Sequence, residues 1–244
     1  MLDPQGIELV ADRLATVRER IRAVAARANR AAEEITLLAV SKRQSAEAIR
    51  AAYAAGQRAF AESYVQEAME KQAQLCDLDI TWHFIGRIQT NKTRQIARQF
   101  AWVHGLCDPE HARRLHEQRP PDQPPLAVCV QVNLSGEHSK GGLSPAALPD
   151  LLEVCARSAR LRVRGLMTLP APATTEEAQR APFRSLRILR DHMATPERPL
   201  DCLSMGMSED LEAAILEGST LVRIGTAIFG PRPTSMSGPM RGQP

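Results

Sequence analysis

The sequence has few aromatic residues and almost no excess of charge of one sign. Aromatic residues make up 4% of its 244 residues, which leaves few platforms on which nucleic-acid bases could stack. The net charge is +3, from 31 basic and 28 acidic residues, so we expect a mixed surface rather than a basic one that follows a phosphate backbone. Nucleic acid is therefore not an expected partner.

Paired cysteines, metal-binding histidine motifs and long apolar runs are also absent from the sequence. The five cysteines are scattered and contain no C-x-x-C pair, which argues against a disulfide framework and a thiolate zinc site. The six histidines show no H-x-x-x-H spacing, so no metal is expected. No apolar run approaches the ~20 residues that span a bilayer, and no secretory signal is recognisable. We expect a cytoplasmic protein with no membrane partner.

Lysine is scarce, since 27 of the 31 basic residues are arginine and four are lysine. Where a positive charge is enough, this chain uses arginine. Lysine differs because a desolvated amine can lose its proton and attack a carbonyl carbon. Lys42 follows the apolar run 35–40, which is typical of a strand buried on both faces of a parallel sheet. Lys42 is therefore a candidate nucleophile, and the alternative is a strand-end lysine that extends into solvent.

Strand and helix patterns alternate along the chain after one long amphipathic helix at 5–30. We predict strands near 35–42, 57–62, 81–86, 102–107, 126–133, 162–170, 200–206 and 219–225. We predict helices near 45–55, 64–76, 89–99, 109–118, 144–159, 174–193 and 209–217. This order predicts a single α/β domain over 1–232, a (β/α)8 TIM barrel with an extra N-terminal helix, followed by a disordered tail at 233–244. An open doubly wound sheet is the alternative, but its G-x-G-x-x-G motif is absent.

In such a barrel the carboxyl ends of the strands meet on one face, where active sites lie. The last two predicted strands bring two glycines, three hydroxyl groups and one methionine to that face: Ser204, Gly206, Met207, Ser208, Gly225 and Thr226. This cluster favours a phosphate held on backbone N–H groups. For Ser208 the alternative interpretation is an ordinary N-cap of the following helix.

The predicted strand 219–225 places Arg223 near the same face, two residues before Gly225. A buried guanidinium needs an anion or another acceptor, so either a functional anion or a structural salt bridge is expected there. If a ligand with a pyridine ring were bound beside Arg223, this fixed positive charge would keep the ring nitrogen unprotonated.

Several motifs, in chain order, resemble the pyridoxal phosphate homeostasis proteins. They are Leu38-Ala39-Val40-Ser41-Lys42, Tyr64-Val65-Gln66-Glu67, Trp82-His83-Phe84-Ile85-Gly86, Gln89-Thr90-Asn91-Lys92, Arg164-Gly165-Leu166-Met167, Ser204-Met205-Gly206-Met207-Ser208 and the run 222–230. The resemblance covers about residues 7–232 and implies a barrel similar to the N-terminal domain of alanine racemase. It also implies pyridoxal 5'-phosphate held as a Schiff base on Lys42, its phosphate on 204–208 and 225–226, and Arg223 at the pyridine nitrogen. Ser63 stands where the family usually has asparagine near the cofactor.

Two classes of function follow from this resemblance. One is a non-catalytic carrier in pyridoxal phosphate homeostasis, which delivers the cofactor to apo-enzymes. The alternative is a pyridoxal phosphate-dependent amino-acid racemase, which needs an acid or base on each face of the substrate. The chain has only Tyr53 and Tyr64 as tyrosines for that second role, and the second domain of a racemase is missing. We expect the carrier, as a monomer, with a dimer as the alternative.

Overall fold

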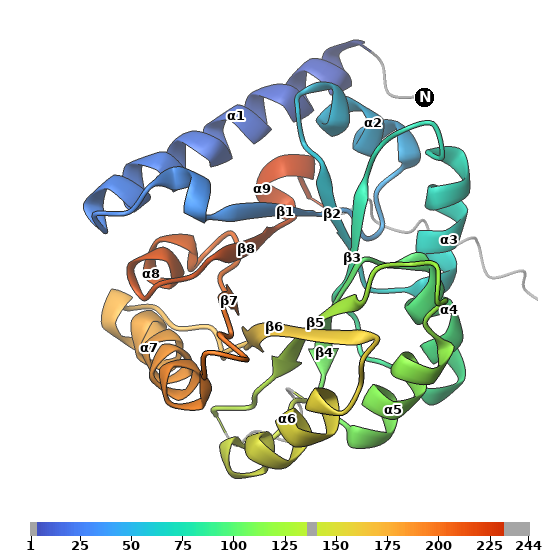
Figure 1. The fold of residues 1–244 in the computed structure, drawn as a ribbon. Helices are drawn as coiled ribbons and strands as arrows, with labels where there is room; N and C mark the ends of the chain where they lie inside the picture. Colours follow the sequence, from blue (N-terminus) through green and yellow to red (C-terminus); the bar gives the residue numbers. More distant parts are fainter. Residues whose placement is uncertain (1–3, 136–140, 232–244) are drawn as a thin grey trace, which may run out of the picture.

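Eight parallel strands close into a barrel in the computed structural model, which describes residues 4–135 and 141–231 (Figure 1). Each strand pairs with the next one along the chain, and β1 pairs with β8 to close the ring. The strands are β1 Thr36–Val40, β2 Ala59–Glu62, β3 Thr81–Phe84, β4 Trp102–Leu106, β5 Leu126–Gln131, β6 Leu161–Met167, β7 Cys202–Ser204 and β8 Leu221–Ile224. The predicted barrel is confirmed, and the predicted tail at 233–244 lies outside the described residues.

Helices surround the barrel on its outer side (Figure 1). The α-helices are α1 Pro4–Arg27, α2 Ala46–Ala54, α3 Val65–Gln74, α4 Thr93–Gln99, α5 Pro109–Gln118, α6 Leu148–Ala156, α7 Glu176–Met193, α8 Leu211–Leu216 and α9 Thr226–Phe229. Short 3-10 turns are η1 Ala32–Glu34, η2 Thr90–Lys92 and η4 Pro145–Ala147. The sequence did not predict α9, because four residues are too few to show a helical period. No helix in the described part of the chain is long and apolar enough to cross a membrane.

Local capping explains where several of these helices begin and end. The Ser45 hydroxyl accepts the N–H of the third residue of α2, and the Asp108 carboxylate accepts the N–H of Glu110 at the start of α5. Both contacts satisfy backbone donors that a helix leaves without partners. Gly56 and Gly218 follow α2 and α8 with φ of 88° and 91°, the left-handed conformation that ends a helix at low cost for glycine.

The extra helix α1 packs along α2, α8 and α9 (Figure 1). Its apolar stripe is buried, with Leu14, Val17 and Ile21 at most 4% exposed. Arg20 on its polar side pairs with Glu212 of α8 at 2.8 Å. The stripe therefore stabilises its own domain.

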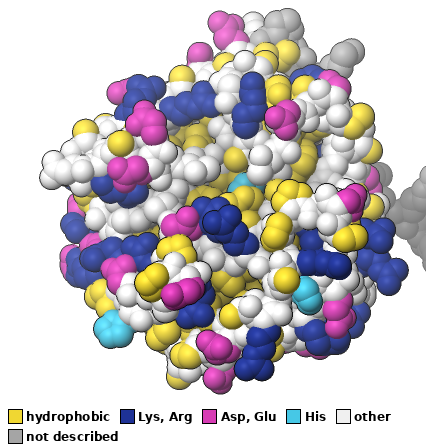
Figure 2. All heavy atoms as spheres, viewed as in Figure 1, with side chains coloured by type: hydrophobic (Ala, Val, Ile, Leu, Met, Phe, Trp, Pro, Cys, Tyr) yellow, Lys and Arg dark blue, Asp and Glu magenta, His cyan; other side chains and the backbone are white. Residues whose placement is uncertain are grey.

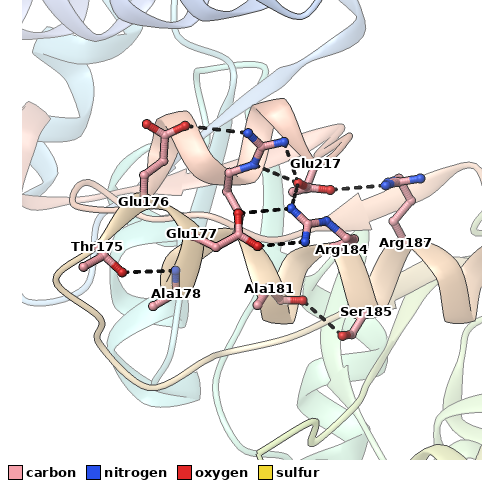
Figure 3. Close-up of polar contacts among 10 residues, drawn as sticks. Thr175, Glu176, Glu177, Ala178, Ala181, Arg184, Ser185, Arg187 and Glu217 are labelled. Carbon is pink, nitrogen blue, oxygen red and sulfur yellow. Dashed lines mark hydrogen bonds and ion pairs between the residues drawn. The ribbon is translucent and has the colours of Figure 1, made fainter.

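A carboxylate between α7 and α8 collects three guanidinium groups (Figure 3). Glu217 directly follows α8, its side chain is 2% exposed, and it pairs with Arg180, Arg184 and Arg187 of α7 at 2.8 to 3.2 Å. These ion pairs join α7 to the end of α8.

Figure 2 shows charged side chains of both signs spread over one face of the molecule, with hydrophobic ones between them, as the near-neutral composition predicted.

Candidate functional site

A cavity of about 320 Å³ lies at the carboxyl ends of the strands. Seven of the nine residues singled out from the sequence line it: Lys42, Ser63, Met207, Ser208, Arg223, Gly225 and Thr226. Ser204 and Gly206 are buried and are not among the lining residues. An apolar wall is formed by the segment 169–173 after β6, together with Ile85 and Met167. The cavity therefore combines one amine, one guanidinium, several hydroxyl groups and the carboxylates of Glu209 and Asp210 with an apolar wall.

Lys42 stands in a tight turn that directly follows β1. The N–H of Gln44 donates to the carbonyl oxygen of Ser41 at 3.0 Å, which closes the turn around Lys42. Arg43 in the same turn has φ of 62°, a left-handed conformation that costs a non-glycine residue about 1 kcal/mol or more. The surrounding structure must therefore hold this turn.

A buried ion cluster lies behind that turn. Lys71 of α3 donates to the carbonyl oxygen of Ser41 at 2.7 Å, to Glu62 Oε1 at 2.8 Å and to Glu67 Oε1 at 2.6 Å. The Ser41 hydroxyl also donates to Glu62 Oε1, at 2.6 Å. Burial raises the pKa of Glu62, and the nearby Lys71 ammonium opposes this shift. No sequence pattern predicted a role for Lys71 or Glu67, although the scarcity of lysine applied to Lys71 as well as to Lys42.

Arg223 is buried and donates to carbonyl and hydroxyl oxygens rather than to a carboxylate. Its guanidinium donates to the Ser204 carbonyl oxygen at 2.5 Å, the Ser204 hydroxyl at 2.8 Å and the Thr168 carbonyl oxygen at 2.9 Å. The salt-bridge alternative is wrong for the described residues, because none of their carboxylates lies within ion-pair distance of Arg223. Burial lowers the pKa of Arg223 to about 10, so the guanidinium stays protonated at neutral pH.

Two buried histidines extend this contact across the barrel interior. His104 Nδ1 lies 2.8 Å from Ser204 Oγ, and His104 Nε2 lies 2.9 Å from His83 Nδ1. His83 stacks on Trp102, with ring centroids 5.3 Å apart. Burial lowers the pKa of His83 to about 3 and that of His104 well below its usual value. Both rings are therefore neutral at pH 7, and His83 is a hydrogen-bonded histidine of the barrel interior.

The segment after β7 is shaped by one glycine and one carboxylate. Gly206 has φ of 97°, its carbonyl accepts the N–H of Arg223 at 2.9 Å, and a Cβ there would lie 2.5 Å from the Cβ of Ala214. Asp210 is the N-cap residue of α8 and accepts the N–H of Met207 at 2.6 Å. Ser208 is therefore not the cap of α8; that alternative is wrong, because the helix begins two residues later than predicted.

The segment after β8 turns directly into the short helix α9. Gly225 and Thr226 stand at its start and line the cavity. The first N–H groups of a helix have no acceptors within the helix, and they offer donors to an anion. In barrels of this kind a phosphate is often bound after the last two strands, at the N-terminus of a short additional helix.

Ser63 lies after β2, two strands from β8 around the closed barrel, and lines the cavity. The backbone at Gly86 passes very close to Ser63, because a Cβ on Gly86 would lie 2.1 Å from the Ser63 carbonyl oxygen.

The described residues contain no group of three or more histidine, cysteine or acidic side chains arranged to hold a metal ion.

The chain is similar to known proteins over most of its length. The family model "Alanine racemase, N-terminal domain" matches residues 13–233. The pyridoxal phosphate homeostasis protein of Pseudomonas aeruginosa is 53% identical over 223 residues, which are 91% of this chain and 96% of that protein. The structure of PipY from Synechococcus elongatus with pyridoxal phosphate bound has a TM-score of 0.80 and 37% identity, and the match covers 91% of this chain and all of PipY.

A more distant structure shares the barrel. Alanine racemase from Corynebacterium glutamicum has a TM-score of 0.62 and 20% identity, and the match covers 94% of this chain and 62% of that one. At this identity the likeness concerns the fold. The chain belongs to the alanine racemase N-terminal domain family and, within it, to the pyridoxal phosphate homeostasis proteins.

Proposed function

We propose that the protein binds pyridoxal 5'-phosphate in the barrel cavity, holds it as a Schiff base on Lys42 and delivers it to apo-enzymes. The observation that carries the proposal is one cavity of about 320 Å³ lined by a primary amine, a buried guanidinium and the start of α9. Its size lies near the lower end of the range of roughly 300–1,000 Å³ for small-molecule sites. The cofactor-bound structure of the related PipY supports the same ligand.

The donors of the cavity fit the chemical groups of this ligand. The Lys42 amine can condense with an aldehyde, with loss of water. Thr226 and Ser208, with the N–H groups at the start of α9, would bind the phosphate. The apolar segment 169–173 offers a wall for the ring.

Arg223 would lie at the ring nitrogen and would disfavour its protonation. The guanidinium is fixed by Ser204 and Thr168 and is charged at pH 7, because its pKa is about 10. When bound, pyridoxal phosphate supplies an aldehyde and an electron-accepting ring. An unprotonated ring accepts electrons poorly, so the bound cofactor would be a weaker electron sink.

The racemase alternative has less support from the lining of the cavity. Among the described residues, neither tyrosine lines the cavity. Tyr64 is 51% exposed, and the guanidinium of Arg58 lies over the ring of Tyr53 at 3.8 Å. The Asp210 carboxylate does line the cavity, but it is hydrogen-bonded to the N–H of Met207. Glu209 also lines the cavity and is exposed. Neither tyrosine is placed to act as the second base, and the carrier is the function we propose.

We further propose a cytoplasmic monomer. All five cysteines are free, which supports a reducing compartment. Delivery would then depend on encounters between the loaded protein and apo-enzymes.

The first test is an absorbance spectrum of the purified protein, followed by borohydride reduction and peptide mapping. We expect a yellow protein with a pyridoxyl group on the Lys42 peptide. Lys42→Ala should abolish covalent attachment and keep the wild-type circular dichroism, while Lys92→Ala, a residue outside the cavity lining, should retain both. A wild-type protein that stays colourless with added pyridoxal phosphate overturns the proposal.

A second test separates carrier from racemase. The loaded protein is mixed with an apo-enzyme that requires pyridoxal phosphate, and separately with L-alanine. We expect the apo-enzyme to regain activity and the alanine to keep its chirality. Steady conversion to D-alanine that is lost in Lys42→Ala would favour the racemase.

A further inference from the structure

The buried ammonium of Lys71 lies beside the turn that carries Lys42, and it is not among the residues that line the cavity. Lys71 is 6% exposed. Its ammonium has three donors, and each has an oxygen acceptor within 2.8 Å: the Ser41 carbonyl, Glu62 and Glu67. Burying a charge costs free energy, and this cost is offset only where every donor or acceptor of the charged group has a hydrogen-bond partner. The Lys71 ammonium therefore has a complete set of acceptors, although the second carboxylate oxygen of Glu62, Oε2, is buried without a partner.

The same three oxygen atoms hold the chain on both sides of Lys42. Before Lys42, the Ser41 carbonyl accepts from Lys71 and the Ser41 hydroxyl donates to Glu62. After Lys42, the N–H of Arg43 donates to the Glu67 oxygen that Lys71 also contacts. The ammonium is therefore the common partner of the residues that flank Lys42.

This support acts where the backbone is strained. Arg43 has φ of 62°, which a residue with a Cβ adopts at a cost, and its N–H is fixed by Glu67. Without the ammonium, the carboxylates of Glu62 and Glu67 would face each other without a counter-ion, and like charges repel. Glu67 would then no longer be held against the Arg43 N–H.

We propose that Lys71 is a positioning residue for Lys42: through Ser41 and Glu67 it fixes the turn that presents the Lys42 amine to the cavity. This inference rests on the proposed function, in which Lys42 takes the aldehyde. Two of the four lysines of the chain then have separate roles, because Lys71 donates to three oxygen atoms of the protein while Lys42 reacts with the aldehyde.

The experiment compares the wild-type protein with Lys71→Met in two measurements. The first is amide hydrogen exchange of the peptide that spans Arg43 and Gln44, in protein without cofactor. The second is the rate constant for attachment of pyridoxal phosphate to Lys42, followed by absorbance and by borohydride trapping. We expect exchange to be at least about 10-fold faster and attachment about 10- to 100-fold slower, since small displacements of a reacting group have effects of this size.

Arg187→Met is the matched control, because it removes a charge from the ion cluster around Glu217 (Figure 3). It should leave both rates unchanged. Glu67→Ala removes the acceptor of the Arg43 N–H and should act like Lys71→Met; it carries the test if Lys71→Met does not fold.

The outcomes distinguish this inference from the proposed function. A wild-type protein that attaches no pyridoxal phosphate overturns both. The second outcome is that the wild-type protein attaches pyridoxal phosphate to Lys42, but either rate is unchanged in a folded Lys71→Met or Glu67→Ala variant. This outcome overturns the positioning role of Lys71 and leaves the proposed function in place. The inference is supported if exchange is faster and attachment is slower in these variants, and if both rates are unchanged in Arg187→Met.

Discussion

The Ser204 hydroxyl lies between Arg223 and a histidine of the barrel interior. Its Oγ is 2.8 Å from the Arg223 guanidinium and 2.8 Å from His104 Nδ1. The guanidinium can only donate, so Ser204 accepts from it and its own proton is available to the ring nitrogen. One side chain that does not line the cavity thus links the charge in the cavity to the polar contacts beneath it.

Ser204→Ala should destabilise the protein. It leaves His104 Nδ1 and one guanidinium donor without their partner in a buried place, and an unsatisfied buried polar group costs about 1–3 kcal/mol. Urea unfolding measures this as a lower midpoint at an unchanged m-value. Ser185→Ala, whose exposed hydroxyl donates to the Ala181 carbonyl oxygen, should change the stability by less than about 0.5 kcal/mol. Equal effects of the two variants would contradict the buried linkage.

Stability should depend on pH through His83. Burial lowers its pKa from 6.5 to about 3, so between these values the unfolded chain binds a proton that the folded chain does not. Stability is then fully present above pH 6.5 and falls as the pH decreases, by about 1.4 kcal/mol per pH unit. His104 contributes in the same direction, while the raised pKa of Glu62 contributes in the opposite one.

A variant comparison isolates the contribution of this histidine. Urea unfolding at pH 6.5 and 5.0 should show a shallower loss of stability in His83→Asn than in the wild-type protein. His192→Asn changes an exposed residue and should keep the wild-type dependence. The same slope in all three proteins would show that His83 is not held neutral.

The barrel was predictable from the sequence because its signals are local. The apolar run before Lys42, the cap at Ser45 and the glycine stop at Gly56 each act within a few residues. All eight strands fall within or overlap the predicted ranges. The exact lengths were less predictable: β7 spans Cys202–Ser204 rather than 200–206, because the chain at Gly206 already has a left-handed conformation.

The cavity lining followed from strand order, whereas the contacts beneath it did not. Any residue at the carboxyl end of a barrel strand faces the same side, which is why Lys42 and Arg223 could be placed together. The contact between His104 and Ser204 joins residues 100 positions apart, and no periodicity reports such a pair. Lys71 did leave a signal, since a lysine in an arginine-rich chain fits a compact three-acceptor site that a planar guanidinium does not match.

Arg223→Gln should change the absorption spectrum of the bound cofactor. Replacing the guanidinium by a neutral amide removes the fixed positive charge, so the ring nitrogen of pyridoxal phosphate can take up a proton. We expect a shifted absorption maximum with a new pH dependence, measured at full occupancy. Arg187→Gln, in the separate cluster around Glu217, should leave the spectrum unchanged. An unchanged spectrum in Arg223→Gln would place Arg223 away from the ring.

Gly206→Ala should destabilise the protein more than a glycine substitution elsewhere in a similar conformation. At Gly206 the added Cβ would lie 2.5 Å from the Cβ of Ala214, with φ at 97°. Overpacking costs about 1–3 kcal/mol, and the left-handed conformation about 1 kcal/mol more. Gly56→Ala separates the two causes, because φ there is 88° but the nearest atoms are 3.7 Å away. In urea unfolding, Gly56→Ala should lose about 1 kcal/mol and Gly206→Ala about 2 kcal/mol or more; equal losses would mean that the backbone after β7 moves freely away from α8.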